Sequence, residues 1–273
     1  MKKIVICPNV YKDVDFSITK NVIKILSGYD CRIYADRQYE YILKDINFAD
    51  SDLYDNADVA ISLGGDGTVL SCISECAKRG IPVLGIDLGK VGYLASLPSD
   101  RLDMLGRLFN GDFAVKERMM LRCSAGKSVY HALNDFIIAD SNILSMISLD
   151  IFKGERELLK YRCTGLIFAT ATGSTAYNLS AGGSVIEPEM ECIAVTPISQ
   201  HSLNPRSIIF SPETVLTVKS GSTPDKRLYI AVDGVAHSLD GCDSVEIQKA
   251  EFSAKLITFG DDEFVKTLLC KLK

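Results

Sequence analysis

Asp66 is the residue with the clearest chemical potential, and it stands in a Gly-Gly-Asp-Gly sequence at positions 64–67. An apolar run, residues 59–63, ends at this motif, and apolar side chains at helical spacing begin directly after it. The pattern predicts a buried strand, a tight turn and the first turn of a helix. Glycines let a ligand approach such a turn closely, and the free amides of the helix start attract phosphate oxygens. Asp66 would then accept a proton or hold a cation where anionic groups gather.

A glycine-rich turn of this kind can also serve packing alone. The dinucleotide fingerprint G-x-G-x-x-G and the phosphate loop G-x-x-x-x-G-K-[ST] are both absent. Local chemistry therefore favours a ligand role for Gly65, Asp66 and Gly67 without identifying the ligand.

A second candidate site is the polar stretch at residues 170–183, which carries five Ser or Thr residues, three glycines and one tyrosine. Such a loop offers donors, acceptors and a ring to a nucleotide, although hydroxyl residues also cap helices. Upstream, Asn134 and Asp135 follow an apolar-alternating run. An amide and a carboxylate side by side can bind adjacent ribose hydroxyls, and a turn-forming Asx pair is an equal alternative.

The spacing of apolar residues predicts which elements position these groups. In the first part of the chain, strands and helices alternate, which is typical of a parallel sheet with helices on both faces. The expected strands are 3–8, 31–35, 57–63 and 81–86, and the expected helices are 16–25 and 68–78. Ligands of such sheets bind at the carboxyl ends of the strands, and Asp66 follows one of these ends.

From about residue 112 the pattern changes to short alternating strands. The expected strands are 114–123, 129–138, 146–152, 158–163, 191–197, 207–210, 215–219, 228–232, 244–249 and 254–258, with a turn at Lys153-Gly154 and a closing helix at 262–272. We therefore predict an α/β N-terminal domain with a parallel sheet (1–111), a β-rich C-terminal domain (112–259) and a C-terminal helix (260–273). A cleft between the two domains would be a common kind of ligand site.

Composition excludes several classes of partner. The chain has 273 residues with 47% hydrophobic and 24% charged residues and a net charge of −5, and it has no basic run, so nucleic acid and anionic membranes are not expected partners. No apolar run reaches the roughly 18 residues of a membrane span, and the N-terminus reads as an opening strand and not a signal peptide. The nine cysteines are irregularly spaced, which indicates reduced thiols in the cytoplasm. Cys72 and Cys76 share a helix face, but no second pair completes a metal site.

Taken together, the motifs resemble the NAD kinase family, also called ATP-NAD kinases, over nearly the whole chain. The residues that carry the resemblance are 64–68, 85–94, 133–135, 165–167, 172–177, 181–183, 196–198 and 201–203. Gly-Gly-Asp-Gly alone is shared with lipid kinases and phosphofructokinases. The Thr-Gly-Ser-Thr-Ala-Tyr sequence at 172–177, following the Asn-Asp pair, is much more specific.

The resemblance implies a two-domain fold and phosphoryl transfer from ATP or another donor, such as polyphosphate, to the 2′-hydroxyl of the adenosine ribose of NAD, giving NADP. It implies that Asp66 is the catalytic base, that a divalent cation, Mg²⁺, bridges donor phosphates, and that the protein is a cytoplasmic homodimer or homotetramer. The family's substrate-binding positions are matched by Gly65, Gly67, Asn134, Asp135, Arg162, Thr164, Thr175, Ala176, Tyr177 and Ser180. Arg162 could equally be a cross-strand surface charge.

The chain departs from the family pattern at a few positions. Thr164 stands where Asp is common, which would weaken a contact to the nicotinamide side of NAD or to a neighbouring subunit. Ala171, Ser184 and Gln200 each stand where proline is usual, and Val235 replaces a polar residue. None of these changes touches Asp66.

Two other functions compete with the NAD kinase interpretation. A lipid kinase would share the first motif, but the second motif set suits a dinucleotide and no amphipathic membrane-binding stretch stands out. A catalytically weak NAD(H)- or NADP-binding regulator is favoured only by Thr164 and opposed by the intact Asp66. The sequence leaves open the phosphoryl donor, the use of NADH, the oligomer number and feedback by NADP.

Overall fold

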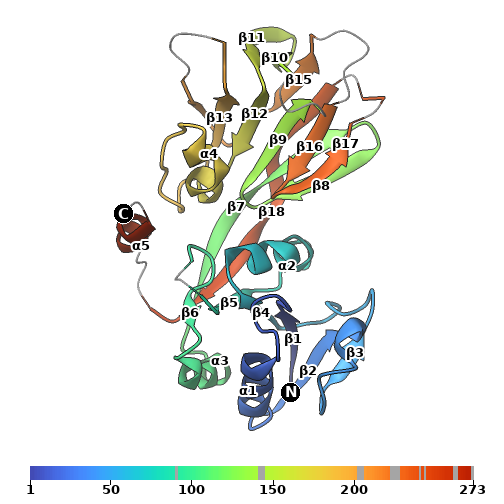
Figure 1. Cartoon of the computed structure of the whole chain (residues 1–273), viewed down its shortest axis with the longest axis vertical. Helices are drawn as coiled ribbons and strands as arrows, with labels where there is room; N and C mark the ends of the chain where they lie inside the picture. The colour runs from blue at the N-terminus through green and yellow to red at the C-terminus, as the bar shows by residue number, and fades with distance from the viewer. Residues whose placement is uncertain are drawn as a thin grey trace. The chain divides into compact units, whose positions relative to one another are not determined.

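The computed structural model describes residues 1–89, 92–140, 145–201, 206–221, 228–239, 241–242, 244–260 and 264–271, and Figure 1 shows the chain. Its residues divide into two compact units. The first is Met1–Glu117 with Ala254–Lys273, and the second is Arg118–Ser253. Two long strands, β7 (Ala114–Ala125) and β18 (Ser244–Thr258), contribute residues to both units.

The first unit is built on a parallel sheet in the order β3-β2-β1-β4-β5. The strands are β1 (Lys2–Pro8), β2 (Cys31–Asp36), β3 (Asn47–Ala49), β4 (Val59–Gly64), β5 (Val83–Asp87) and the short β6 (Leu97–Pro98). The helices are α1 (Ser17–Leu26), α2 (Asp66–Lys78), α3 (Arg107–Asn110) and α5 (Phe264–Lys271), with 3₁₀ turns η1 (Arg37–Tyr39) and η2 (Leu102–Gly106). The predicted parallel α/β arrangement is confirmed.

Strands β1 and β4 lie side by side at the centre of this sheet, and the chain leaves them in opposite directions. The β1–α1–β2 crossover goes one way and the β4–α2–β5 crossover the other. Since both crossovers are right-handed in such folds, their helices cover opposite faces. Neighbouring side chains of β1 accordingly point to opposite faces of the sheet. Ile6 packs in the core that includes α1, whereas Cys7 contacts Cys72 of α2. The carboxyl ends of β1 and β4 therefore form the switch point at which ligands bind in open α/β sheets.

The second unit contains two antiparallel layers around one apolar core. One sheet has the order β14-β13-β12-β9-β16-β17, formed by β14 (Ile208–Phe210), β13 (Ile193–Ile198), β12 (Gly165–Ala169), β9 (Asp135–Asp140), β16 (Leu228–Val232) and β17 (Val235–Ser238). The facing strands are β11 (Arg156–Cys163), β10 (Ile147–Lys153), β15 (Leu216–Ser220), β18, β7 and β8 (Ser128–Ala132). Phe136 and Phe168 of the first layer and Leu149 and Ile247 of the second belong to the same buried cluster. The predicted β-rich region is thus confirmed.

Several elements differ from the sequence-based expectation. The predicted strand 129–138 is broken at Leu133–Asn134 into β8 and β9, because the amides there bond to a side chain and not to a neighbouring strand. The predicted strands 244–249 and 254–258 are one continuous strand, β18, whose Phe252 packs on the ring of His131 at 4.7 Å between centroids. Strand β12 was not predicted; it is buried on both faces and its residues do not alternate. The short strands β3, β6 and β17 and the short helix α3 were not predicted either.

Other expectations are met where the structure describes them. Gly154 turns between β10 and β11 with a φ of 60°. The closing helix runs over Phe264–Lys271, while positions 262, 263 and 272 of the expected range lie outside the described residues. Among the described residues, no helix has the length and apolar character that a membrane crossing requires.

Candidate active site

The turn from β4 into α2 is tightly packed by its glycines. A Cβ on Gly64 would lie 2.1 Å from Thr68 Oγ1, so no larger residue fits there. Asn9, which follows β1, donates from Nδ2 to the same Thr68 oxygen at 2.9 Å. These contacts join the ends of β1 and β4 to the first turn of α2. Gly67 is exposed, and no atom of the residues that the structure describes lies within 4 Å of its would-be Cβ, which leaves room for a ligand at the start of the helix.

Asp66 is the first residue of α2, and three consecutive backbone amides hold its carboxylate. Tyr93 donates to Oδ2 at 2.9 Å, and Leu94 and Ala95 donate to Oδ1 at 2.9 and 3.1 Å. Gly92 packs directly behind, since a Cβ there would lie 2.0 Å from Oδ1. The side chain is still 29% exposed. Asp66 is therefore fixed in orientation while one side stays accessible.

Lys271 of α5 approaches that accessible side. Its Nζ lies 3.5 Å from Asp66 Oδ2 and 4.1 Å from the centre of the Tyr93 ring. The Tyr93 ring also packs on Phe264 of α5, with centroids 6.0 Å apart. A carboxylate has about four lone-pair sites for hydrogen-bond donors. Three amides and this ammonium group together fill them.

A second carboxylate, Asp87, lies at the end of the neighbouring strand β5. It is 4% exposed, and its Oδ1 accepts the Gly89 amide at 2.9 Å. Its Oδ2 is buried and has no hydrogen-bond partner among the residues that the structure describes. Lys12 reaches the same place and donates to the Gly64 carbonyl at 3.1 Å. A Cβ on Gly65 would lie 2.6 Å from Lys12 Nζ and 3.7 Å from Asp87 Oδ1, so an anion-binding and a cation-binding group meet beside the glycine turn.

In the second unit, the Asn134–Asp135 pair is organised by Asp233. The amides of Leu133, Asn134 and Asp135 donate to the Asp233 carboxylate at 2.8, 2.8 and 3.1 Å. Asp233 itself has a positive φ of 45°, in the turn between β16 and β17. This arrangement breaks the strand at Leu133–Asn134, and Asp135 is the first residue of β9, opposite Ala169 of β12.

Asp135 has an unusual electrostatic environment. It is 4% exposed. Burial raises the pKa of Asp135 to about 7, and the nearby charge of Asp233 adds to the effect. Burial also raises the pKa of Asp233, although the three amides that it accepts act against this. Asp135 therefore titrates near neutral pH.

The polar stretch at 170–183 packs against this pair. Thr170 Oγ1 donates to the Leu133 carbonyl at 2.6 Å and accepts the Gly173 amide at 3.0 Å. A Cβ on Gly173 would lie 2.0 Å from the backbone oxygen of Asn134, so only glycine allows this approach. The 3₁₀ turn η3 (Thr172–Thr175) and the short helix α4 (Tyr177–Ser180) follow from this point.

Asn178 supports the loop from within, and it was not among the predicted site residues. It is fully buried, its Nδ2 donates to the carbonyls of Ser174 and Ser184, and its Oδ1 accepts the Thr196 hydroxyl at 2.6 Å. Only its position inside the polar stretch could have pointed to it.

The remaining candidate residues also lie in this unit. Tyr177 is 45% exposed, Ser180 is exposed, and Thr175 and Ala176 are half-buried beside them. Thr164 is half-buried and donates its hydroxyl to the Ile198 carbonyl at 3.1 Å. Arg162 is exposed on β11. The structure thus groups Asn134 and Asp135 with the 170–183 stretch in one unit, and Gly65, Asp66 and Gly67 in the other.

Comparisons with known proteins agree over the whole chain. Residues 16–113 match the ATP-NAD kinase N-terminal domain and residues 133–259 match the ATP-NAD kinase C-terminal domain. An NAD kinase of Thermoanaerobacter sp. (strain X514) is 34% identical over 100% of this chain and 99% of that protein, and an NAD kinase of Geobacter sp. (strain M21) is 32% identical with the same coverage.

Solved structures show the same architecture. An NAD kinase from Archaeoglobus fulgidus in complex with ATP superposes with a TM-score of 0.77 at 27% identity, covering 100% of this chain and 98% of that one. A yeast NADH kinase complexed with NADH gives a TM-score of 0.90 at 24% identity, covering 100% of this chain and 87% of that one. The latter likeness supports the fold alone.

Proposed function

The chain belongs to the ATP-NAD kinase family and is an enzyme that phosphorylates NAD to NADP; we propose that Asp66 accepts the proton of the ribose 2′-hydroxyl in this transfer. The observation that carries the proposal is the environment of Asp66. The three amides fix the carboxylate in direction, and its exposed side lies at the carboxyl edge of the sheet. Phosphoryl transfer needs positioning, charge neutralisation and a proton acceptor more than covalent help.

We propose that the donor phosphates bind next to Asp66, at the start of α2. Gly67 leaves the helix start open, and amides of a first helical turn favour phosphate oxygens. Lys12, beside Gly65, supplies a positive charge at the same place. The 2′-oxygen then attacks the terminal phosphorus as its proton passes to Asp66, and the bond to the bridging oxygen of the donor breaks.

Members of this family use a divalent cation, and the residues near the turn fit one that arrives on the donor phosphates. No group of three His, Cys, Asp or Glu residues within the described part of the chain could hold a metal alone. Asp87, however, keeps a buried oxygen without a partner beside the glycine turn. Mg²⁺ is commonly bound by one or two carboxylates together with substrate phosphates. We propose Mg²⁺ as the cation, with Asp87 as its protein ligand; when bound it would neutralise phosphate charge.

We propose that the β-rich region, residues 112–259, binds NAD. The Asn134 amide would donate hydrogen bonds to ribose hydroxyls and accept them, and the Asp135 carboxylate would accept them. Tyr177 would offer its exposed ring to the dinucleotide. Thr175, Ala176 and Ser180 would line the same surface. Thr164 and Arg162 would lie towards the nicotinamide end. The nine free thiols support a cytoplasmic enzyme, and we propose that it forms a homodimer or homotetramer.

The test is NADP formation by the purified protein with NAD, Mg²⁺ and ATP, read with an NADP-specific dehydrogenase. Asp66→Asn should lower turnover at least about 10²-fold, while the affinity for NAD, measured by calorimetry, stays within about twofold because Asp66 is not the group that anchors the dinucleotide. Polyphosphate serves as a second donor. An absence of NADP with either donor, despite NAD binding, would leave a dinucleotide-binding regulator instead.

A further inference from the structure

Lys12 is an exposed lysine whose charged end nevertheless has a defined place beside the glycine turn. Its Nζ donates to the Gly64 carbonyl at 3.1 Å, and a Cβ on Gly65 or on Gly89 would lie 2.6 or 3.9 Å from that nitrogen. No carboxylate of the described residues pairs with this ammonium group, and the Gly64 carbonyl takes one of its three donors. A lysine side chain has many rotamers, so we looked for the contacts that hold its backbone in place.

Asn9, the residue directly after β1, organises the segment that carries Lys12. Its side-chain Oδ1 accepts the amides of Tyr11 and Lys12 at 3.0 and 3.2 Å. Its backbone carbonyl accepts the amides of Lys12 and Asp13 at 3.1 and 2.9 Å. An asparagine side chain that bonds the backbone two residues further on forms a local turn. The Lys12 amide is therefore shared between two oxygens of Asn9, and the backbone of the lysine is fixed relative to Asn9.

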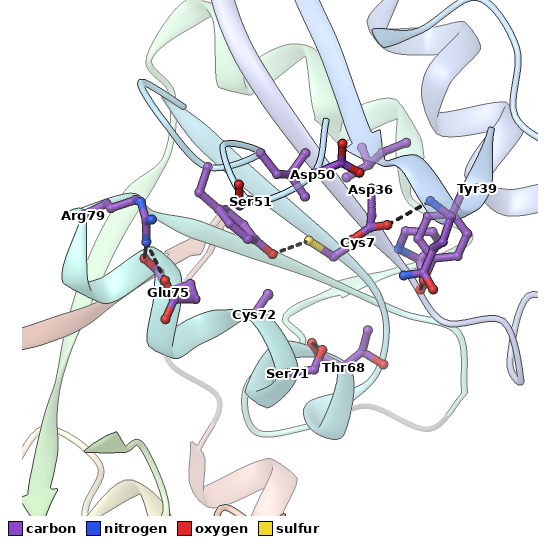
Figure 2. Close-up of a pocket in the computed structure, with 15 residues that line it drawn as sticks. Cys7, Asp36, Tyr39, Asp50, Ser51, Thr68, Ser71, Cys72, Glu75 and Arg79 are labelled. Atoms are coloured by element: carbon purple, nitrogen blue, oxygen red, sulfur yellow. Dashed lines mark hydrogen bonds and ion pairs between the residues drawn. The ribbon is translucent and has the colours of Figure 1, made fainter. Parts of the chain in front are cut away.

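The other end of the Asn9 side chain is attached to the first turn of α2. Its Nδ2 donates to Thr68 Oγ1 at 2.9 Å, while its backbone amide donates to the Leu63 carbonyl at the end of β4 at 2.9 Å. Figure 2 shows Thr68 on α2, where it is one of the residues that line a cavity of about 300 Å³. Neither Asn9 nor Lys12 lines that cavity. Asn9 thus connects the start of α2 to the segment of Lys12 with one side chain.

The far end of the same segment is anchored to α1 by Asp13. This carboxylate is 3% exposed and accepts the amide and the hydroxyl of Thr19 at 2.8 and 2.6 Å. The segment 9–13 is therefore held to α2 at one end and to α1 at the other, and Lys12 lies between the two anchors. A charged group that is held in place before reaction stabilises developing charge without a cost of reorganisation.

We propose that Asn9 is a positioning residue, which holds Lys12 where its ammonium group neutralises the charge of the phosphoryl group during transfer. The proposal rests on the function proposed above. In phosphoryl transfer the negative charge is spread over the oxygens of the group in flight, and protein cations placed there lower the barrier. The remaining donors of Lys12 are available to those oxygens. Lys12 meets the substrate, and Asn9 acts only through Lys12.

The experiment is a double-mutant cycle on the single-turnover rate of NADP formation with saturating NAD, Mg²⁺ and each donor that the wild type accepts. Lys12→Met removes the charge and should lower the rate at least about 10²-fold. Asn9→Ala should lower it about tenfold, because the charge is then misplaced. In the Lys12→Met background, Asn9→Ala should change the rate by less than about twofold, since a residue that acts through another has no separate effect once the other is removed.

Two further variants complete the design. Asn47→Ala is the matched control: it removes an asparagine whose Nδ2 donates to the Ile33 carbonyl at 3.1 Å, on the edge strand β3 of the same sheet, and it should leave the rate within about twofold. Thr68→Val keeps the shape of the side chain and removes the acceptor of Asn9 Nδ2. It breaks the same connection from α2 and replaces Asn9→Ala in the cycle if that variant does not fold, which thermal unfolding determines.

Each outcome decides the proposal. A loss of rate from Asn9→Ala that disappears in the Lys12→Met background supports it. The same loss in both backgrounds overturns it, because Asn9 would then serve the turn independently of Lys12. A wild-type rate in either single variant overturns it as well. A failure of the proposed function would be seen differently, as an absence of NADP formation by the wild type with every donor.

Discussion

Asp66 and Asp233 hold their surroundings in the same way, although they lie in different units. Each carboxylate accepts three consecutive backbone amides, from residues 93–95 in the first case and residues 133–135 in the second. In both cases the amides belong to a loop that contributes to a candidate site. The same local arrangement of hydrogen bonds therefore shapes each of the two candidate sites.

The two carboxylates differ in what surrounds their remaining acceptor sites. Asp66 has an exposed side, which Lys271 approaches. The pKa of Asp233 is raised by burial, and the carboxylate lies beneath the loop that it organises. We infer that Asp66 both holds its loop and meets the substrate, whereas Asp233 acts by positioning Asn134 and Asp135. Three hydrogen bonds from backbone amides do not by themselves distinguish a reacting carboxylate from a positioning one. Access to the substrate does.

The largest expected effect comes from the two glycines that pack against these loops. Gly173→Ala would place Cβ 2.0 Å from the Asn134 backbone oxygen, and backbone cannot move aside cheaply. We expect a loss of about 1–3 kcal/mol in the free energy of unfolding, together with a large loss of NAD affinity. Gly92→Ala would meet the Asp66 carboxylate, a side chain that can rotate away only by giving up hydrogen bonds from the amides of residues 93–95. Turnover should then fall by about tenfold or more, with a loss of stability from these hydrogen bonds.

Denaturant unfolding and steady-state kinetics of both variants test this contrast. Gly182→Ala is the control for the general cost of adding a methyl group beside the second site. Within the described part of the chain, no atom lies within 4 Å of its would-be Cβ, although its φ of 85° adds backbone strain. A Gly173→Ala protein as stable as the wild type would show that the loop can shift. This result would contradict the positioning role of the 170–173 turn.

The sequence predicted most of the regular structure but not the side chains that shape the sites. Helical spacing identified α1 and α2, because each buries one well-defined face. Continuous apolar runs identified the strands β1 and β4, and β4 is buried along its whole length. The break at Asn134 was missed because Leu133 continues the apolar pattern, and the amides that leave the sheet bond to Asp233, about 100 residues away. Pattern reasoning sees neighbours in sequence and cannot see such a partner.

The same limit applies around Asp66. Its motif was recognisable because glycines and a carboxylate between a strand and a helix are a local signal. The contact of Asp66 with Lys271 was not recognisable, because 205 residues separate the two side chains. A lysine in a closing helix is typical of a solvated surface charge. Asp87 was likewise read as part of a motif, while its unpartnered buried oxygen became visible only in three dimensions.

A smaller effect on NAD binding is expected from a change of pH, and it concerns Asp135. The pKa of Asp135 is raised to about 7, first by burial. If its carboxylate accepts a ribose hydroxyl, NAD should bind about tenfold more weakly at pH 6 than at pH 8, as expected for one group with this pKa. Calorimetry of NAD binding across this range measures the effect. Asp135→Asn should remove the pH dependence, because the amide does not titrate.

Protein stability should change with pH in the opposite direction. A carboxyl whose pKa is raised in the folded protein stabilises the fold when protonated. This contribution is complete below the ordinary pKa of 3.8 and is lost as pH rises through about 7. Denaturant unfolding of the wild type and Asp135→Asn between pH 5 and 8 should therefore diverge. Parallel stability profiles would contradict the proton assignment, whatever the binding result.

The smallest expected effect concerns Lys271, which fills the last acceptor site of Asp66 at 3.5 Å. The ribose hydroxyl needs that site to pass its proton, so the ammonium group must move away before reaction. Lys271→Met keeps the length of the side chain and removes its charge, and it should raise kcat/KM for NAD by about two- to threefold, since partly exposed ion pairs are weak. The gain should shrink at high salt, where the wild-type pair is already screened. Lys24→Met, an exposed lysine on α1, is the charge-matched control. A fall in kcat/KM with Lys271→Met would show instead that this lysine assists transfer. Asp66 would then depend on α5 for its activity, as Asp135 depends on Asp233 for its position.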